Sequence, residues 1–282
     1  MRKTVAVSLI DEATLARQLA GSDPPTVIDV RWRLGEPSAR PAYRHGHVPG
    51  AAFLDLDGEL CGEPGPGGRH PLPPVERLRD ALRAAGVRNA HAVVVYDHGD
   101  GQAAARLWWT LRWAGHTDVA VLDGGFAAWV EAGRPVEPGE AEPPHGDFVI
   151  RPGQLPILDA DGAARLAGDG VLLDARVEQR YRGEVEPVDR EPGRIPGAVN
   201  LPAAALVGDD GRLRPPAELR RLFEAVGVRG DRSVGAYCGS GITAARTVFA
   251  LHQAGFEGAG LYVGSWSEWI TDPDRPVATG EG

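Results

Sequence analysis

The feature that most constrains this chain is an internal repeat, because its second half replays its first half at an offset of about 140 to 147 residues. Residues 27–31 form an apolar run that ends in Asp-Val-Arg, and residues 172–176 form one that ends in Asp-Ala-Arg. Both runs are typical of short buried strands. The chain has 282 residues, which at about 150 residues per domain is close to two domains. We therefore expect two copies of one domain.

Four further pairs of segments extend this repeat along the chain. They are the Gly- and Pro-rich turns 46–51 and 193–198, the strand-like runs 93–96 and 233–237, the helical stretches 103–114 and 243–254, and the segments 122–129 and 262–269. Each helical stretch is followed by a glycine, the residue that commonly ends a helix. Strands that alternate with helices predict an α/β fold with two tandem domains, each a mainly parallel sheet flanked by helices.

The boundary between the two copies is predicted from proline content. Residues 134–152 contain five prolines and show no sustained hydrophobic period, which is typical of an extended linker. We place the boundary near residue 145. The expected organisation is a first domain over residues 1–140, a linker over 141–152 and a second domain over 153–282.

Charge and composition exclude several classes of partner. The chain carries 30 basic and 39 acidic residues, a formal charge of −9, and no run of Lys or Arg that would follow a phosphate backbone, so we expect no nucleic acid partner. No apolar run approaches the length that spans a membrane, so we expect no membrane partner. The first apolar stretch, VAVSLI, is too short for a signal peptide, which predicts a cytoplasmic protein.

The two cysteines are too few for a disulfide framework. Neither Cys61 nor Cys238 belongs to a Cys-x-x-Cys pair of the kind that binds zinc or forms a dithiol redox site. We therefore expect no metal and no other cofactor, and each cysteine needs its own explanation.

The two halves differ most at one loop, where Asp97 follows the strand-like run in the first half and Cys238 follows it in the second. Glycines let successive backbone N–H groups point inward, and a helix N-terminus adds partial positive charge, so the second loop is predicted to cradle an anion. The candidate substrate-binding residues of this loop are Gly239, Gly241, Ile242 and Thr243. A thiolate in such a cradle is a nucleophile. The alternative is a buried structural cysteine, a common fate of a free thiol.

The spacing around this cysteine discriminates between kinds of chemistry. A cysteine phosphatase needs an arginine six positions after the nucleophile, whereas the first arginine after Cys238 is Arg246, eight positions on. A cysteine protease or acyl transferase needs a histidine to activate the sulfur, and a cradle makes such a base unnecessary. Transfer of a sulfur atom through a cysteine persulfide fits the loop better.

The same residues resemble a known family, the two-domain rhodanese-like sulfurtransferases, over essentially the whole chain. Residues 238–244, Cys-Gly-Ser-Gly-Ile-Thr-Ala, resemble the active loop of the 3-mercaptopyruvate sulfurtransferase branch. Thiosulfate-preferring members typically carry Arg and Lys directly after the cysteine. Residues 46–51, 193–198 and 264–269 resemble further signatures of the family. The resemblance implies a catalytically inert first domain, in agreement with Asp97.

The resemblance implies a sulfurtransferase that moves sulfur from 3-mercaptopyruvate to a thiol or cyanide acceptor through a persulfide on Cys238, with thioredoxin as a candidate acceptor. A loop without cations suits the single carboxylate of 3-mercaptopyruvate better than the dianion thiosulfate. Two alternatives stay open: a thiosulfate:cyanide sulfurtransferase, and, from a different class, a non-catalytic rhodanese-like binding module.

The family also suggests residues that bind the donor. Arg180 falls where the family has its substrate arginine. A second substrate arginine usually follows a Pro-Glu-Pro segment, which is shortened here, so Arg190 is the candidate. Arg182 and Arg194 are further nearby cations that would favour a thiosulfate or sulfonate donor.

The mercaptopyruvate branch implies a relay that takes the proton of the donor thiol. Ser240 matches the serine of this relay, and His70 and Asp57 match the histidine and aspartate that the first half of the chain contributes. A thiol donor loses a proton before or during sulfur transfer, and a Ser-His-Asp arrangement can remove it.

Overall fold

The computed structural model describes residues 8–281, which divide into two compact units. One unit holds residues 8–62 and Pro73–Gln154, and the other holds Glu63–Leu72 together with residues 155–281. The second unit is therefore discontinuous, because it takes a segment from the first half of the sequence. The predicted bounds assigned that segment to the first domain.

The segment expected as a linker, residues 141–152, groups with the first unit. The N–H of Gly146 donates to the carbonyl of Arg83 at 2.7 Å, and Phe148, which is buried, donates to the carbonyl of Val87 at 3.2 Å. These backbone hydrogen bonds tie an otherwise irregular, proline-rich stretch to the last turn of the helix Val75–Ala84 and to the residues that follow it.

The first unit is built on a five-stranded parallel sheet in the order β1-β5-β4-β2-β3. Its strands are β1 (Leu9–Ile10), β2 (Thr26–Asp29), β3 (Ala52–Phe53), β4 (Val93–Tyr96) and β5 (Val119–Leu122). Its helices are α1 (Glu12–Leu19), α2 (Arg40–His45), the π-helix η1 (Leu56–Leu60), α3 (Val75–Ala84), α4 (Gln102–Trp113) and α5 (Gly125–Glu131).

The second unit repeats this order with β6-β10-β9-β7-β8, again all parallel. Its strands are β6 (Ile157–Leu158), β7 (Val171–Asp174), β8 (Val199–Asn200), β9 (Val234–Tyr237) and β10 (Gly260–Tyr262). Its helices are α6 (Ala160–Asp169), α7 (Glu178–Arg182), the 3₁₀ helix η2 (Ala203–Leu206), α8 (Pro216–Ala225), α9 (Ile242–Gln253) and α10 (Ser265–Trp269). The prediction of two α/β units with parallel, helix-flanked sheets is confirmed.

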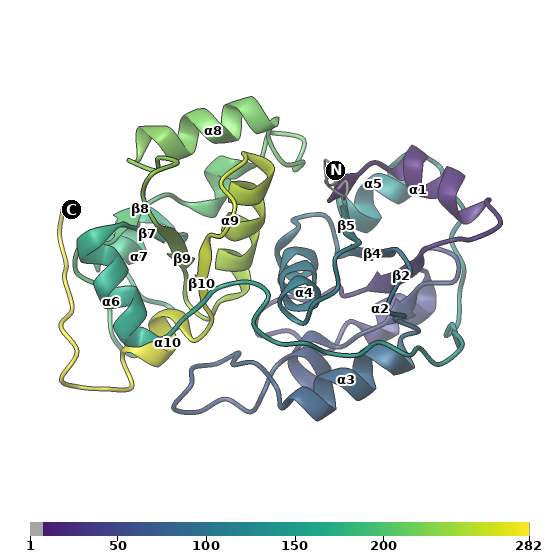
Figure 1. Ribbon diagram of the computed structural model, residues 1–282, viewed down its shortest axis with the longest axis horizontal. Helices are drawn as coiled ribbons and strands as arrows, with labels where there is room; N and C mark the ends of the chain where they lie inside the picture. The colour runs from purple at the N-terminus through teal and green to yellow at the C-terminus, as the bar shows by residue number, and fades with distance from the viewer. Residues whose placement is uncertain (1–7, 282) are drawn as a thin grey trace. The chain divides into compact units, whose positions relative to one another are not determined.

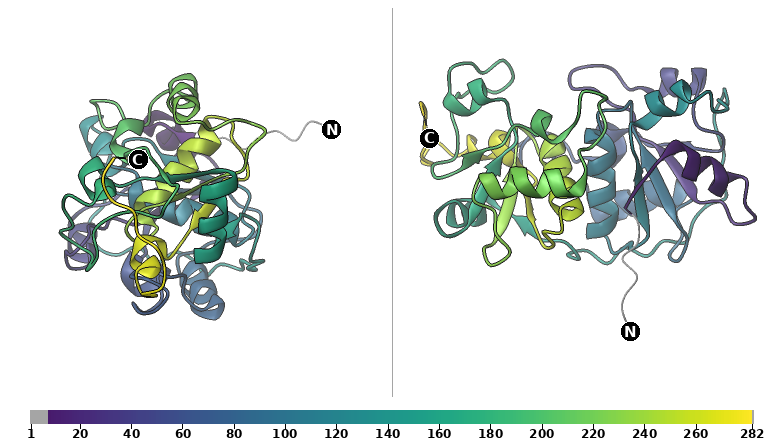
Figure 2. Two further views of the ribbon diagram at one scale, coloured as in Figure 1. Left: turned by 90° about the vertical axis from the view of Figure 1, so that its left-hand side faces the viewer. Right: turned by 90° about the horizontal axis from the view of Figure 1, so that it is seen from above.

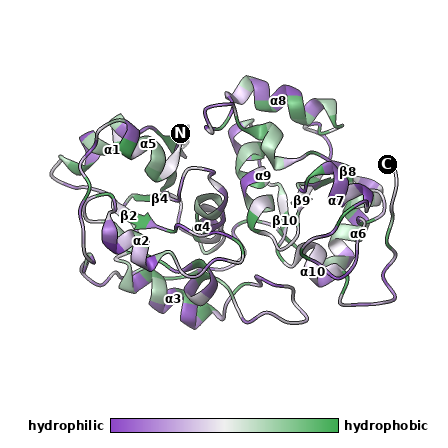
Figure 3. Ribbon diagram, turned by 180° about the vertical axis from the view of Figure 1, so that it is seen from behind, coloured by the Kyte–Doolittle hydropathy of each residue, from purple (hydrophilic) through white to green (hydrophobic). Residues whose placement is uncertain are grey.

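Helices cover both faces of each sheet (Figures 1 and 2). In the first unit α4 packs on the sheet from one side, and Leu15 of α1 and Trp129 of α5 belong to the core on the other. In the second unit α9 lies on β9 and β10, while α6 and α10 cover the opposite face. The central strands are buried along their length, as continuous apolar runs require. Figure 3 shows α8 with apolar and polar residues interspersed, as in a surface helix that buries Leu219 and Phe223.

The repeated Asp-x-Arg motif braces the end of one strand in each unit. Asp174 is fully buried, and the Arg176 guanidinium donates to its carboxylate at 2.7 Å and to a carbonyl of the following turn, also at 2.7 Å. Asp29 and Arg31 form the same pair in the first unit. The motif therefore belongs to the fold of both units.

Within residues 8–281, no helix is both long enough and apolar enough to cross a lipid bilayer.

Candidate active site

Cys238 stands directly after β9, at the carboxyl end of a central parallel strand, where α/β sheets bind ligands. The loop 238–241 leads from this strand into α9. Its last residue, Gly241, has φ +81°, a left-handed conformation that glycine adopts without steric cost. The N–H of Gly241 donates to Cys238 Sγ at 3.2 Å. The cysteine is 3% exposed, so its sulfur lies in a largely dehydrated site.

The predicted anion cradle therefore has the N–H of Gly241 on the sulfur and the N-terminus of a twelve-residue helix after it. Both favour negative charge on sulfur. Gly239 lies in the same loop, and Ile242 and Thr243 form the first turn of α9. Their part in binding a donor remains a prediction.

A second loop holds the cysteine loop in place. The N–H of Cys238 donates to Ser265 Oγ at 3.1 Å. In return, the N–H of Trp266 donates to the carbonyl of Cys238 at 3.0 Å, and the N–H of Ser267 donates to that of Gly239 at 2.9 Å. These hydrogen bonds fix the backbone on both sides of the sulfur.

The backbone of Ser265 is strained, because its φ of +54° is left-handed. Every other described residue with positive φ is a glycine. The first unit has a glycine, Gly125, at the corresponding place, with φ +57°. The Ser265 hydroxyl explains the exception, because it accepts from Cys238 and donates to the carbonyl of Tyr262 at 2.7 Å. Ser265 is thus a positioning residue for the cysteine loop.

We expect Ser265→Ala to destabilise the chain by about 1–3 kcal/mol, since the buried N–H of Cys238 loses its acceptor while the strain persists. Ser265→Gly loses the same hydrogen bond but relieves the strain, so its loss is smaller. Urea unfolding of both variants measures the difference. Equal stability of Ser265→Ala and the parent chain contradicts the positioning role.

The structure brings Ser240 and His70 together. His70 Nδ1 and Ser240 Oγ share a hydrogen bond of 2.7 Å, and the two residues are 8% and 6% exposed. His70 belongs to the segment Glu63–Leu72, which packs with the second unit. The backbone N–H of Arg69 donates to Ser267 Oγ in α10 at 3.1 Å, and this hydrogen bond anchors the segment.

Asp57, the third member of the predicted relay, lies in the first unit within η1. Its side chain is exposed and accepts a hydrogen bond from Trp32 Nε1 at 2.8 Å. Its part in a relay remains a prediction.

Arg180 is held by two carboxylates on the loop that follows α7. Its guanidinium lies 2.7 Å from Glu186 and 2.9 Å from Asp189, whose side chains are each 3% exposed. Burial disfavours the charge on Glu186, but hydrogen bonds from Arg180 and from backbone N–H groups outweigh it and hold the pKa of this carboxyl below its usual value. The loop therefore presents Arg180 as a fixed cation.

The other predicted cations, Arg190, Arg182 and Arg194, form hydrogen bonds with groups outside the cysteine loop. The guanidinium of Arg190 donates to the carbonyl of Ile270, after α10. Arg182 pairs with Glu178 at 2.5 Å, and Arg194 donates to the carbonyl of Gly280 at 2.8 Å. Arg182 and Arg194 both line an open hollow of about 650 Å³ beside α7 and β8.

Sequence reasoning missed Arg69, which pairs with Asp189. A Cβ atom placed on Gly239 would lie 2.8 Å from Arg69 Nη2 and 3.6 Å from Arg180 Nη2. Arg69 is next to His70 in the sequence. It lies 170 residues before Gly239, so no local sequence pattern indicates that Arg69 is close to the cysteine loop.

The equivalent loop of the first unit contains its own anion. The Asp97 carboxylate accepts from the N–H groups of Gly99 at 2.9 Å, Gly101 at 3.1 Å and Ala104 at 3.1 Å. The first unit thus has a cradle of backbone N–H groups as well, and an acidic side chain fills it.

Asp97 gives a pH-dependent contribution to stability. Burial, reinforced by Asp100, raises its pKa from 3.8 to about 6, against the lowering effect of the three N–H groups. Because the folded-state pKa lies above the unfolded one, the contribution of Asp97 is greatest below pH 3.8 and falls as pH rises through about 6. Asp97→Asn should therefore remove a fall in stability between about pH 4 and pH 6.

Urea unfolding of the parent chain and of Asp97→Asn across this pH range measures that difference, with the exposed Asp118→Asn as the matched control. A constant stability gap between parent and Asp97→Asn over the whole range contradicts the assignment.

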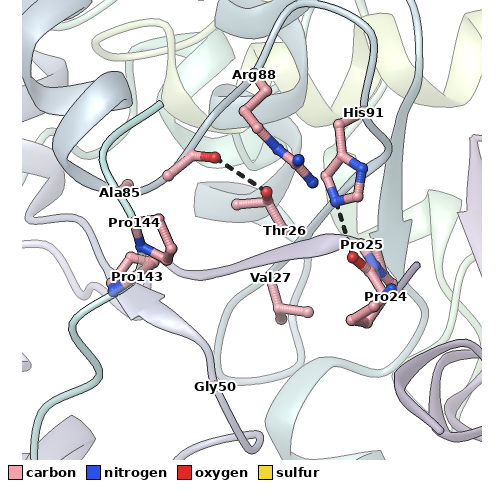
Figure 4. A pocket seen from close by; sticks show the side chains of 11 residues that line it. Pro24, Pro25, Thr26, Val27, Gly50, Ala85, Arg88, His91, Pro143 and Pro144 are labelled. Atoms are coloured by element: carbon pink, nitrogen blue, oxygen red, sulfur yellow. Dashed lines mark hydrogen bonds between the residues drawn. The ribbon is translucent and has the colours of Figure 1, made fainter. Parts of the chain in front are cut away.

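The first unit contains a second cysteine and a cavity, and neither has the anion cradle of the cysteine loop. Burial raises the pKa of Cys61 to about 11, so its thiol is a poor nucleophile. A cavity of about 260 Å³ lies at the amino end of β2, away from the Asp97 loop (Figure 4). Thr26 in its lining donates to the carbonyl of Gly86 at 3.2 Å, and His91 Nε2 bonds to that of Pro24 at 2.8 Å.

Known proteins resemble the chain along almost its whole length. The rhodanese-like domain model matches it twice, at residues 12–132 and 159–272. A Pseudomonas aeruginosa protein, provisionally named 3-mercaptopyruvate sulfurtransferase, is 48% identical over 279 residues, covering 94% of this chain and 97% of its own. SseB of Mycobacterium tuberculosis, provisionally named thiosulfate sulfurtransferase, is 44% identical over 278 residues, covering 96% of this chain and 97% of its own.

Among solved structures, SseA from Escherichia coli, identified as a 3-mercaptopyruvate sulfotransferase, matches with a TM-score of 0.82 at 32% identity, covering 93% of this chain and 100% of SseA. The two bacterial relatives share sulfur transfer in their names and differ in the donor named. The resemblance inferred from the motifs is confirmed. With both halves matched by one domain model and relatives this similar over nearly all of its length, the chain belongs to the two-domain rhodanese-like family.

Proposed function

We propose that this chain is a sulfurtransferase that takes sulfur from 3-mercaptopyruvate and passes it to a thiol or cyanide through a persulfide on Cys238. The observation that carries the proposal is the cysteine loop: a sulfur that accepts an N–H at the N-terminus of α9, with the hydrogen-bonded pair Ser240 and His70 in the same unit. The names of the bacterial relatives and of SseA support this class of activity.

In the first half-reaction the Cys238 thiolate attacks the donor sulfur. A sulfur–sulfur bond forms, the carbon–sulfur bond of 3-mercaptopyruvate breaks, and its electron pair leaves on carbon as the enolate of pyruvate. The proton of the donor thiol ends on that carbon, so the products are pyruvate and a persulfide anion. The N–H of Gly241 and the N-terminus of α9 favour negative charge on Cys238 Sγ before transfer.

Ser240 and His70 supply the route for that proton. Their hydrogen bond of 2.7 Å lets the serine oxygen exchange a proton with the ring nitrogen. In this account Ser240 takes the proton of the donor thiol, His70 holds it, and it returns to the enolate carbon. Asp57 is proposed to orient the histidine.

In the second half-reaction an acceptor thiolate attacks the outer sulfur and the sulfur–sulfur bond breaks. The acceptor leaves as a persulfide and Cys238 returns as a thiolate, while cyanide leaves as thiocyanate. This is ping-pong covalent catalysis. A cytoplasmic location and a thioredoxin-type acceptor belong to the same proposal.

The choice of donor rests on charge. The loop itself contributes Gly239 and Ser240, which are uncharged, and this favours the single carboxylate of 3-mercaptopyruvate. A thiosulfate donor is the second candidate, because two guanidinium groups, Arg69 and Arg180, lie beside Gly239. The corresponding loop of the first unit carries the Asp97 carboxylate in place of a thiol, which supports the assignment of transfer to Cys238.

Steady-state sulfur transfer to one acceptor, with 3-mercaptopyruvate and thiosulfate in parallel, tests the donor through the ratio of kcat/KM values. The proposal expects the higher kcat/KM for 3-mercaptopyruvate. A higher value for thiosulfate overturns the donor while leaving the persulfide, and activity with neither donor favours the binding module.

A further inference from the structure

We infer that the cavity at the amino end of β2 is a second ligand site, and that it binds a small monocarboxylate with an apolar body. All of its lining residues belong to the first unit, so Cys238 has no part in it. The inference therefore goes beyond the proposed sulfur transfer and does not depend on it.

The cavity lies at the opposite edge of the sheet from the Asp97 loop. Thr26 begins β2, while Gly50 and His91 stand just before β3 and β4. Because these strands are parallel, their amino ends share one edge of the sheet, whereas Asp97 follows the carboxyl end of β4. The cavity is thus not the counterpart of the cysteine loop.

Comparison of the two units explains the space. The helix before the first buried strand has eight residues in the first unit, as α1, and ten in the second, as α6. A Cβ atom on Gly197 would lie 2.9 Å from the carbonyl oxygen of Ala167 in α6. On Gly50, the corresponding glycine, a Cβ atom would meet nothing within 4 Å beyond its chain neighbours. The shorter helix of the first unit therefore leaves open a space that the second unit fills.

The walls of the cavity are apolar and rigid. Pro24 and Pro25 line one side, and Pro143 and Pro144 line another (Figure 4). A Cβ atom on Gly86 would lie only 3.1 Å from Pro143 Cβ, so this second pair packs closely on the loop after α3. Pyrrolidine rings lack a donor and fix the backbone, so an apolar ligand meets a surface that needs little ordering on binding.

Arg88 supplies the cavity with a cation. Its side chain lies close to that of His91, above Thr26 (Figure 4). Thr26 and His91 are bonded to the carbonyls of Gly86 and Pro24. The Arg88 guanidinium, by contrast, forms no hydrogen bond or ion pair with any residue that the structure describes. Its donors are therefore open to a ligand, and a carboxylate accepts two of them at once.

The backbone of Arg88 is fixed although its side chain is exposed. Its carbonyl accepts a hydrogen bond from Nε2 of His116, a buried residue, at 3.0 Å, and the next backbone N–H donates to Asp147 Oδ1 at 3.0 Å. The carboxylate nearest to His91 is that of Asp23, at 3.5 Å, and it is 83% exposed. The cation at the cavity is thus held in place without a paired carboxylate.

Size and charge together define the class of ligand. A volume of about 260 Å³ is smaller than the range of about 300–1,000 Å³ that is usual for drug-sized ligands, so the ligand is small. Its carboxylate would bind Arg88, and the rest of the molecule would contact the proline rings and Val27. Benzoate has both features and serves as the probe.

Calorimetric titration of the whole chain with benzoate, in the absence of any sulfur donor, tests the site. We expect saturable binding with a Kd of about 1 mM or tighter. Arg88→Gln should weaken this binding about tenfold, the loss of a charge-assisted pair of hydrogen bonds, and Arg88→Lys should retain part of it. Benzamide, which keeps the ring without the charge, should bind the parent about tenfold more weakly than benzoate and be unaffected by Arg88→Gln.

Two further variants locate the bound benzoate. Arg79→Gln removes the same charge from an exposed position on α3 and should leave the affinity unchanged. Arg180→Gln removes a cation beside the cysteine loop and should also leave it unchanged. Equal affinity of Arg88→Gln and the parent, a loss confined to Arg180→Gln, or acetate binding as tightly as benzoate overturns the inference. Because no donor is present, the titration decides this site even if the chain transfers no sulfur.

Discussion

Cys238→Ser abolishes sulfur transfer with 3-mercaptopyruvate and with thiosulfate alike, with a loss of at least about a thousandfold in kcat. The reason is covalent: both half-reactions pass through a sulfur–sulfur bond to Cys238 Sγ, and a serine oxygen forms no equivalent intermediate. The hydroxyl retains the volume and the N–H contact of the loop, so the fold should persist. Steady-state assays with each donor, alongside thermal unfolding, measure the two effects.

Cys61→Ser is the matched control, because that thiol is buried in the first unit and its raised pKa, about 11, makes it a poor nucleophile. It should retain the activity of the parent chain. Turnover that survives Cys238→Ser with either donor contradicts the persulfide mechanism.

His70→Gln reduces kcat/KM for 3-mercaptopyruvate by about 10²–10⁴-fold, the usual contribution of a positioned acid–base group. The physical reason is the proton of the donor thiol, which needs a base at the 2.7 Å hydrogen bond between Ser240 and His70. Thiosulfate carries no such proton, so its kcat/KM should fall much less. Ser240→Ala should show the same selectivity.

Comparison of the two donors within each variant measures this selectivity, and His45→Gln, which changes an exposed histidine of the first unit, is the control. Equal losses with the two donors would show that Ser240 and His70 support the loop rather than move a proton.

The fold was predictable because it is encoded locally and twice. Strands such as Val93–Tyr96 are continuous apolar runs, and the helices after them end at glycines. The packing of Glu63–Leu72 with the second unit was not predictable, since this Gly- and Pro-rich segment has no hydrophobic period. Its attachment depends on close packing: Gly68, at φ +94°, would place a Cβ only 2.7 Å from the carbonyl of Gly264.

The cysteine loop of the site was likewise predictable, because strand, glycines and helix follow one another in the sequence. Pairing His70 with Ser240 required the family resemblance, since the two residues lie 170 positions apart. Arg69 escaped prediction because one arginine in a Gly-rich segment carries no signal of its own. Which arginine reaches the loop depends on Asp189 and on the carbonyl of Ile270, contacts that only the folded chain defines.

The central claim is that sulfur rests on Cys238 between the two half-reactions. Intact-mass spectrometry after incubation with 3-mercaptopyruvate and no acceptor tests it most directly, with peptide mapping to locate the modification. We predict a gain of one sulfur atom per chain, on the peptide that contains Cys238, lost again when cyanide is added. An unmodified chain that still releases pyruvate, or a sulfur carried by Cys61, would contradict the account.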